Sequence, residues 1–248
     1  MAQLPKRAKV VIIGQGGIVG SSVAHHLIEH GWDDLVGLEK SAIPTDIGST
    51  SHASDFCFTT SHDKLNIYTT KYSQAFYQQR GNYVKCGGME VARVDDDERM
   101  DELRRKVGSG KAFGTNVSMI SPAQAKELFP LLDESQIQGA MWDPDAGLVV
   151  PRSQKVAGDL VEEAVATGKL TVFPYTPATR IDVQDGQVRG VETDKGYIET
   201  EYVVLAMGIW GPLMANTAKA PLPLMPLEHP LLFFGPYEAL AGTGKQIV

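Results

Sequence analysis

The first clear pattern along the chain is an unbroken apolar run at residues 10–13. Such a run predicts a strand covered on both faces, as in a parallel sheet. Small and apolar residues then recur at helical spacing, which predicts a helix. The residues on its apolar face are Gly20, Val23, Ala24, Leu27 and Ile28. A second apolar run at 35–38 ends at Glu39, so the chain opens with a predicted strand, glycine turn, helix and strand.

Further along, the periodicity predicts helices at 63–79, 96–107 and about 122–129, and a glycine-led strand at 87–93. Ser153 is a predicted cap for a stronger helix that should cover the first sheet. The apolar stripe of that helix is Val156, Ala157, Leu160, Val161, Ala164 and Val165. Short strands are predicted at 170–173, 180–183, 188–193 and 197–206. Asp185-Gly186 predicts a hairpin turn between 180–183 and 188–193, which begins a small antiparallel meander. In the predicted strand at 197–206, the buried residues 203–206 should lie in the same sheet as the first strand, 10–13.

The turn after the first strand has little side-chain bulk, because Gly14, Gly16, Gly17 and Gly20 fall within seven residues. Glycines let a backbone approach a diphosphate, and the first N–H groups of a helix stabilise its negative charge. A Gly-x-Gly-x-x-Gly pattern read from Gly14 would place its third glycine at Val19. Gly20 fits with one inserted residue or with the spacing Gly14, Gly17, Gly20. We therefore expect a nucleotide-binding turn.

Glu39 lies nineteen positions after Gly20, where a dinucleotide fold uses a carboxylate to accept hydrogen bonds from the adenosine ribose. A carboxylate would repel a 2'-phosphate, so FAD or NAD is favoured over NADP. The segment at 41–61 is rich in Ser, Thr, Pro, Asp and Gly, which predicts a long loop where an NAD domain would begin another helix. That loop and the returning strand at 203–206 count against an NAD dehydrogenase.

The composition narrows the function classes. The chain has 248 residues, 43% hydrophobic, and a formal net charge of -7 without a basic block. A negative net charge without a basic patch argues against binding to nucleic acid or to an anionic membrane and favours a small-molecule ligand. No apolar run approaches the ~20 residues of a membrane span, and residues 1–8 are too short and polar for a signal peptide. Two cysteines and no clustered ligands predict no metal site and a cytoplasmic location, or the mitochondrial matrix in a eukaryote.

Five short motifs, taken together and in order, carry a resemblance that spans nearly the whole chain. They are residues 48–53 (Gly-Ser-Thr-Ser-His-Ala), 87–92, 130–132, 145–148 and 206–211. They resemble the dimethylglycine and sarcosine dehydrogenase or oxidase group of the D-amino-acid-oxidase-like FAD-dependent oxidoreductases. The resemblance implies an α/β chain with a Rossmann-like FAD-binding domain of glutathione-reductase type. A second, α+β lobe would be a substrate domain with an antiparallel sheet, incomplete here.

The domain boundaries expected from this resemblance are 1–60 and 150–220 for the FAD-binding domain, and 61–149 and 221–248 for the substrate domain. Relatives continue well past this point, often into a folate-binding domain. We therefore expect the chain to be an N-terminal part of such an enzyme. Tetrahydrofolate would then bind only to a C-terminal domain that this sequence does not include.

The resemblance also implies roles for single residues. His52 would bond covalently to the flavin, and His229 would act beside a downstream tyrosine as the catalytic base. Residues at the diphosphate, the adenosine, the flavin and the returning strand complete the implied cofactor site. They are Gly14, Gly16, Gly17, Ile18, Val19 and Gly20, then Glu39 and Lys40, then Gly48, Ser49, Thr50, Ser51, His52 and Ala53, with Ala178, Gly208 and Trp210.

The activity implied is FAD-dependent oxidative demethylation of dimethylglycine or sarcosine, with hydride transfer from a CH–NH donor to flavin. Oxygen or an electron-transfer flavoprotein would accept the electrons. Two alternatives remain open: another amine or amino-acid oxidase of the same fold, and a flavin-binding regulatory subunit without turnover. In relatives of the latter kind the loop histidine is replaced, so His52 counts against it. An extra residue in the glycine turn, a longer segment before Gly48, and Asp55 where relatives tend to have glycine depart from the family pattern.

Overall fold

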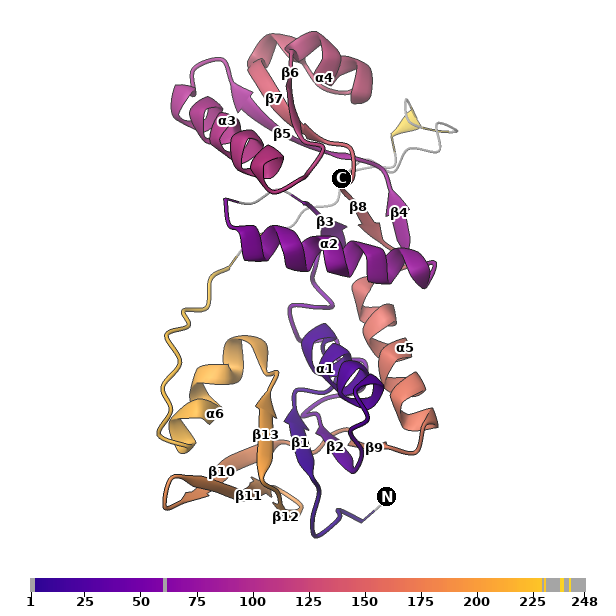
Figure 1. Cartoon of the computed structure of the whole chain (residues 1–248), viewed down its shortest axis with the longest axis vertical. Coiled ribbons are helices and arrows are strands. Elements are labelled where there is room, and N and C mark those ends of the chain that lie inside the picture. Colours follow the sequence, from indigo (N-terminus) through magenta and orange to yellow (C-terminus); the bar gives the residue numbers. More distant parts are fainter. Residues whose placement is uncertain (1–2, 60–61, 229, 231–236, 239–240, 242–248) are drawn as a thin grey trace. The chain divides into compact units, whose positions relative to one another are not determined.

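The computed structural model describes residues 3–59, 62–228, 230, 237–238 and 241. The chain divides into two compact units (Figure 1). Unit 1 comprises Met1–Ala53 and Pro151–Leu231, and unit 2 comprises Ser54–Val150 and Leu232–Val248.

Unit 1 is built on a four-stranded parallel sheet with the order β13-β1-β2-β9. The strands are β1 (Val10–Ile13), β2 (Leu35–Leu38), β9 (Leu170–Phe173) and β13 (Tyr202–Leu205). Val10, the first residue of β1, pairs with Leu35 and Tyr202, the first residues of β2 and β13, so the three strands start at the same level of the sheet. Because they are parallel, the segments that follow β13, β1, β2 and β9 all emerge at the same edge of the sheet. This carboxyl edge is where ligands bind in sheets of this kind.

The two faces of this sheet are covered by different layers, because successive strand residues point to opposite sides. Val10, Ile12 and Leu35 pack on one face with Ala24 and Ala164. The helices on that side are α1 (Ile18–Glu29) and α5 (Ser153–Ala166). The other face packs against an antiparallel meander and a short helix. These are β10 (Ala178–Gln184), β11 (Gln187–Thr193), β12 (Gly196–Glu199) and α6 (Gly211–Thr217), which follows the 3-10 turn η2 (Gly208–Trp210).

Unit 2 contains two three-stranded antiparallel sheets, ordered β5-β7-β6 and β3-β8-β4. The first sheet is formed by β5 (Gly88–Arg93), β6 (Ser118–Ile120) and β7 (Ile137–Asp143), with α3 (Asp97–Ala112), α4 (Pro122–Leu128) and the 3-10 turn η1 (Glu134–Gln136). The second is formed by β3 (Phe56–Cys57), β4 (Tyr83–Lys85) and β8 (Gly147–Val149), and α2 (Lys64–Gln79) completes the unit. Ala92, Leu103 and Met141 lie in the cluster that joins α3 to its sheet.

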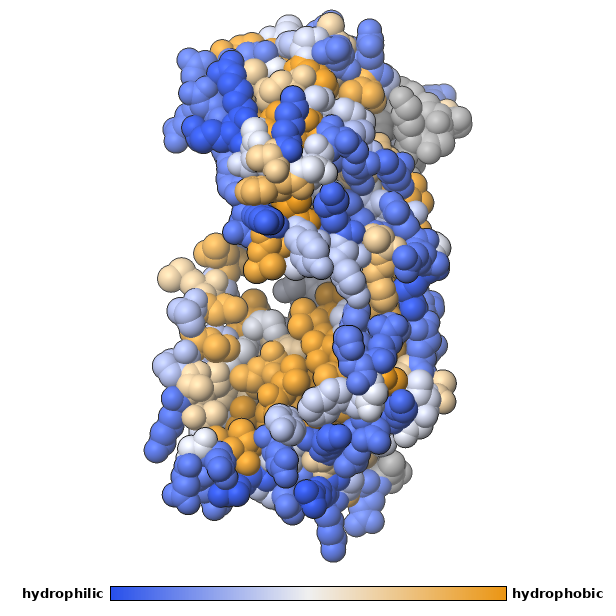
Figure 2. All heavy atoms as spheres, viewed as in Figure 1, coloured by the Kyte–Doolittle hydropathy of each residue, from blue (hydrophilic) through white to orange (hydrophobic). Residues whose placement is uncertain are grey.

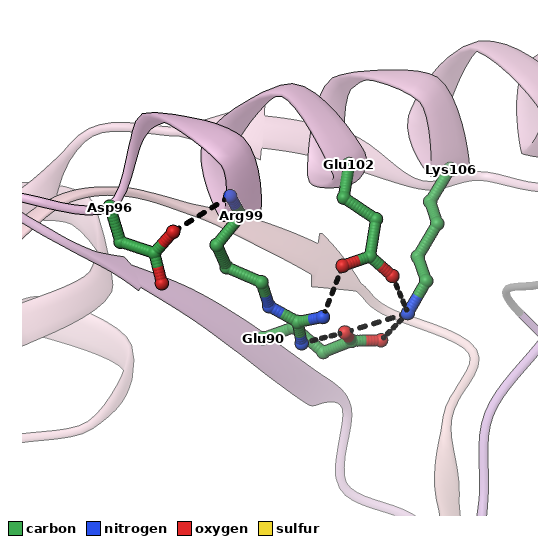
Figure 3. Close-up of polar contacts among 5 residues, drawn as sticks. All are labelled: Glu90, Asp96, Arg99, Glu102 and Lys106. Atoms are coloured by element: carbon green, nitrogen blue, oxygen red, sulfur yellow. Dashed lines mark hydrogen bonds and ion pairs between the residues drawn. The ribbon is translucent and has the colours of Figure 1, made fainter.

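A network of ion pairs ties α3 to β5 (Figure 3). Arg99 donates to Glu90 at 2.5 Å and to Glu102 at 2.7 Å, and Lys106 donates to Glu90 at 2.9 Å. Only 13% of the Glu90 side chain is exposed, so its charge is held largely by these two cations rather than by water. One side of α3 is therefore bonded to the sheet through Glu90.

The predicted mixed α/β fold is confirmed, with the strands at 10–13, 35–38 and 170–173 placed as expected. Other details were wrong. The single strand expected at 197–206 is two, β12 in the meander and β13 in the parallel sheet; the predicted return of 203–206 to the first sheet is confirmed, because β13 pairs with β1. Ser153 is the first residue of α5 and Arg152 is its cap residue, without a side-chain bond.

Two boundaries also differ. The helix expected to end at 107 continues to Ala112. Gly110 within this last part packs closely, since a Cβ at that position would lie 2.5 Å from the Thr115 Oγ1. The loop at 41–61 includes the short strand β3. Four strands and one helix carried no sequence expectation, namely β4, β6, β7, β8 and α6.

Candidate cofactor site

The turn between β1 and α1 needs glycine at three positions. Gly14 has φ +96°, and a Cβ there would lie 2.4 Å from the carbonyl oxygen of Ala206. A Cβ at Gly16 would lie 2.9 Å from the Thr45 nitrogen, and one at Gly20 would lie 2.3 Å from the Gly14 oxygen. At Gly17 the nearest contact would be an ordinary 3.5 Å. The closely packed glycines are therefore Gly14, Gly16 and Gly20, the spacing with one inserted residue.

The N-terminus of α1 offers donors for an anion. Gly17 caps the helix without a side-chain hydrogen bond, and the N–H of Ile18 donates to the Thr50 hydroxyl at 3.0 Å. The N–H groups of Val19 and Gly20 have no acceptor within the described part of the chain. Val19 is 58% exposed, whereas Gly20 is buried. Unused N–H groups and the positive end of a helix dipole favour a phosphate here.

Glu39 is 6% exposed and is fixed in the same turn. One carboxylate oxygen accepts the N–H of Gly16 at 3.0 Å, and the other accepts the N–H of Ser41 at 3.2 Å and its hydroxyl at 3.3 Å. The Ser41 hydroxyl also bonds to Thr45 at 2.8 Å. A carboxylate oxygen can accept more than one hydrogen bond, so Glu39 keeps capacity for a ligand hydroxyl. Ser41 and Thr45 were missed in the sequence, where the only signal was the polar composition of 41–61.

The loop that carries His52 is organised around one carbonyl oxygen. Gly48 accepts from the Ser51 N–H at 3.2 Å, the Ser51 hydroxyl at 2.9 Å and the His52 Nδ1 at 3.0 Å. Donation from Nδ1 to this carbonyl requires the tautomer protonated at Nδ1, in which Nε2 keeps its lone pair; the Ser51 hydroxyl also lies 3.0 Å from Nδ1. The His52 side chain is exposed. Arg152, at the start of α5, donates to the Ser51 carbonyl at 3.1 Å and so joins this loop to the second half of unit 1.

The remaining predicted residues also lie in unit 1. Lys40 is exposed, and its Nζ lies 3.3 Å from the centroid of the Trp210 ring. Gly208 has φ +52° at the start of η2, and Ala178 is the first residue of β10, paired with Thr193. Ser49 is exposed, and Ala53 is half-buried. The predicted catalytic residue His229 lies outside the described residues.

Apolar side chains gather on the surface of unit 1 over the ends of β1 and β13 and toward α6 (Figure 2). Among the exposed apolar residues of this unit are Val19, Ile47, Ile209 and Leu213, the last 70% exposed. A surface of this kind beside polar backbone groups suits a ligand that has both a charged linker and an apolar ring.

In unit 2 the structure joins two of the motifs noted in the sequence. The N–H of Gly87 donates to the Ala146 carbonyl at 2.9 Å, and Gly87 has φ +78° against the Trp142 ring. Asp143 is fully buried and accepts from Thr59 and from the Asp145 N–H. Burial raises the pKa of the nearby Tyr83, whose hydroxyl donates to the Asp145 carbonyl at 2.9 Å. These bonds shape the junction of the two sheets.

No group of three or more His, Cys, Asp or Glu side chains placed to hold a metal ion occurs within the described ranges. Among those same residues, no helix has both the length and the apolar character required to cross a membrane.

Comparison with known proteins gives a consistent family match. The family model "FAD dependent oxidoreductase" matches residues 9–246. The mitochondrial pyruvate dehydrogenase phosphatase regulatory subunit of Mus musculus is 34% identical over 244 residues, which are 95% of this chain and 27% of that protein. Mitochondrial dimethylglycine dehydrogenase of Rattus norvegicus is 31% identical over 231 residues, which are 90% of this chain and 26% of that protein.

Among solved structures, L-proline dehydrogenase from P. horikoshii superposes with a TM-score of 0.79 at 28% identity. The match covers 87% of this chain and 57% of that one. The chain thus spans about a quarter of the length of these two curated relatives and just over half of this solved chain.

Proposed function

The chain belongs to the FAD-dependent oxidoreductase family, and on that premise we propose that its protein oxidises an N-methylated glycine, dimethylglycine or sarcosine, with FAD as the electron acceptor in the site. The observation that carries the proposal is the hydrogen bond between Thr50 and Ile18. It brings the loop with His52 to the helix N-terminus where a diphosphate would bind. A cofactor held at that N-terminus could therefore reach the imidazole.

The residues of unit 1 fit FAD. The glycine turn leaves no room for side chains at Gly14, Gly16 and Gly20, and the N–H of the exposed Val19 has no acceptor in the described part of the chain, so it can donate to the diphosphate. Glu39 has acceptor capacity for the ribose hydroxyls. We place Gly17, Ile18, Lys40, Gly48, Ser49, Ser51, Ala53, Ala178, Gly208 and Trp210 around the same cofactor. Unit 1 would then be the FAD-binding domain, and unit 2 would begin the substrate domain.

His52 is proposed as the residue to which the flavin is covalently linked. Its Nδ1 hydrogen bond to Gly48 leaves Nε2 as the nucleophilic nitrogen, and Arg152 restrains the loop from the other side. When bound, FAD supplies the acceptor for a hydride from the methyl or methylene carbon beside the substrate nitrogen. His229 is proposed as the base that keeps this nitrogen unprotonated, so that its lone pair assists hydride departure.

The wider reaction is proposed on the same premise. The oxidised amine would release its one-carbon group as formaldehyde, or pass it to tetrahydrofolate if a folate-binding domain is present. Electrons would leave to oxygen or to an electron-transfer flavoprotein. We propose a cytoplasmic location, or the mitochondrial matrix in a eukaryote, because the composition favours a reducing compartment.

A second candidate is a flavin-binding regulatory subunit without turnover, favoured by the 34% identity to the mouse phosphatase regulatory subunit. The two candidates share a fold and differ in whether an amine reduces the flavin. A third possibility, oxidation of another amine or amino acid such as proline, differs only in the substrate.

The test uses the whole protein that contains this chain. After acid denaturation, yellow colour that stays with the polypeptide and maps to the His52 peptide by mass spectrometry supports covalent attachment. His52→Ala should release the flavin, whereas His30→Ala, at the far end of α1, should not. Anaerobic bleaching by dimethylglycine or sarcosine, but not by glycine or proline, supports the substrate class. Flavin that no amine bleaches would favour the regulatory subunit, and protein that binds no flavin would refute the proposal.

A further inference from the structure

The contact between Lys40 and Trp210 crosses the carboxyl edge of the sheet in unit 1. Lys40 follows β2, Trp210 follows β13, and β1 lies between these two strands. Strands two places apart are separated by roughly 9–10 Å. The Lys40 ammonium, 3.3 Å from the Trp210 ring centroid, therefore lies across the end of β1, where the glycine turn begins.

The glycine turn at this edge has a nearby carboxylate but no cationic side chain of its own. Residues 14–22 contain no Lys or Arg, and Glu39 places a buried carboxylate against the N–H of Gly16. A diphosphate at the turn would bring further negative charge close to this carboxylate. Backbone N–H groups and the helix dipole supply only partial positive charges, so a full positive charge at the same edge would stabilise the ligand.

A lysine does not hold such a position unaided, because its four-carbon stem is flexible and its ammonium is strongly hydrated. Lys40 is exposed and has no carboxylate partner within the described part of the chain. The face of an indole attracts a cation and restricts where it lies. Trp210 is half-buried at the start of α6, which gives the ring a fixed base.

We propose that Trp210 is a positioning residue that holds the Lys40 ammonium over the glycine turn, where it neutralises the diphosphate of the cofactor. The inference rests on the FAD assignment above and deepens it. It assigns the two residues one joint role at the diphosphate, whereas the resemblance implied that Lys40 lies at the adenosine, and the indole acts through the lysine.

The same unit contains a natural control. The Lys9 Nζ lies 5.0 Å from the centroid of the Trp32 ring, and both residues precede their strands, β1 and β2. This second lysine–tryptophan pair is therefore at the opposite, amino edge of the sheet. It offers similar chemistry without a nearby glycine turn.

The experiment measures ADP binding directly by calorimetry. Adenosine binding is measured by competition, as the loss of apparent ADP affinity when adenosine is present. The parent is the full-length protein with His52→Ala, freed of flavin by dialysis, so that no covalent cofactor blocks the site. Lys40→Met should weaken ADP binding about tenfold and reduce its salt dependence, while adenosine binding changes less than about twofold. Trp210→Leu should weaken ADP binding by about fivefold, and Trp210→Phe, which keeps a ring, by less. Lys9→Met should change neither.

The decisive measurement is the double variant. If Trp210 acts through Lys40, then Lys40→Met/Trp210→Leu should bind ADP about as well as Lys40→Met alone. Losses that multiply, or adenosine binding that falls as much as ADP binding in Trp210→Leu, would overturn the inference. Trp210→Phe and Lys40→Met conserve enough bulk to be judged even if Trp210→Leu unfolds. A parent that binds neither ADP nor adenosine would instead refute the FAD assignment itself.

Discussion

The hydroxyl of Thr50 accepts a hydrogen bond from the backbone N–H of Ile18 at 3.0 Å, thirty-two residues away in the chain. This bond supplies an acceptor that the N-terminus of α1 otherwise lacks, because Gly17 provides no side-chain cap. It also fixes the loop two residues before His52. One contact therefore links the predicted diphosphate turn to the predicted attachment residue.

Thr50→Val keeps the shape of the side chain and removes the acceptor. We expect a loss of about 1 kcal/mol in the free energy of unfolding, as for other helix-start contacts. We also expect covalent flavin incorporation about tenfold slower, because the His52 loop loses its anchor. Thr50→Ser should retain both properties. Time courses of in vitro flavin incorporation and urea unfolding measure the two effects; an unchanged incorporation rate in Thr50→Val would show that the loop is positioned by other contacts.

Gly14→Ala and Gly31→Ala form a matched pair at the two ends of α1. Both glycines have positive φ, +96° and +85°. A Cβ at Gly14 would meet the Ala206 oxygen at 2.4 Å, whereas one at Gly31 would meet nothing within 4 Å. Gly31→Ala should cost about 1 kcal/mol from backbone strain alone, and Gly14→Ala about 3 kcal/mol or more. Equal losses in urea unfolding would mean that the turn moves to accommodate the methyl group.

Local patterns predicted much of unit 1 but not the contacts that complete its site. The run at 10–13 and the glycines after it are readable because a buried strand and a tight turn each leave a local signature. The approach of Lys40 to Trp210 and of Glu39 to Gly16 depends on strand order, which no local pattern encodes. The spacing from Gly20 indicated Glu39 as a nucleotide-site residue, whereas only the motif resemblance assigned Lys40 and Trp210 to the same site.

Unit 2 was harder to predict for a different reason. Strands β4, β6 and β8 are three residues long, too short for an alternating pattern to be distinguished from a loop. β7 is longer, but its buried residues include Gly139 and Ala140, which lower the apparent strand propensity. Helix α6 did have a usable signal, because Pro212 is typical of a first helical turn.

The ion pairs of α3 predict a pH dependence of stability. Hydrogen bonding from Arg99 holds the pKa of Glu102 below the ordinary value of 4.5. A lowered folded-state pKa means that this stabilisation is present above the unfolded-state value and is lost as the pH falls through the folded-state value. Glu102→Gln should therefore be less stable than the wild type at about pH 6, and the difference should shrink by about pH 3.

The control for this measurement is Glu127→Gln, on the exposed surface of α4. It should show no comparable difference at either pH. Chemical unfolding of the three proteins at both pH values separates the effect of Glu102 from the general loss of stability in acid. A wild-type-minus-variant difference that grows in acid would contradict the assigned ion pairs.

The two cysteines of this chain should react slowly as nucleophiles. Burial raises the pKa of the Cys57 thiol, with a smaller contribution from Asp55, and burial also raises that of Cys86. Because the thiolate is the reactive form, alkylation at about pH 8 should be roughly tenfold slower than for a small-molecule thiol. Peptide-resolved mass spectrometry over a pH series should give midpoints above 9.0. Urea should remove the difference, and rapid alkylation of the folded protein would contradict the burial.

Gln15 and Gly37 pack as a complementary pair beneath the glycine turn. Gln15 is fully buried, and a Cβ at Gly37 would lie 2.5 Å from its Cγ. Its amide nitrogen donates to the Gly20 carbonyl at 3.4 Å, while its oxygen has no hydrogen-bond partner in the described part of the chain. Gly37→Ala should therefore cost about 2 kcal/mol in the free energy of unfolding, because the added methyl group displaces a side chain that has no free space.

Gln15→Ala alone should also destabilise the protein, by about 1–2 kcal/mol, because it opens a cavity and removes the bond to Gly20. The double variant should lose less than the sum of the two, since the alanine at 37 then occupies space vacated by the glutamine. Gly108→Ala, in α3 with nothing within 4 Å of its added Cβ, controls for the glycine-to-alanine change itself and should be neutral or stabilising. Strictly additive losses in urea unfolding would show that the two side chains do not share that space.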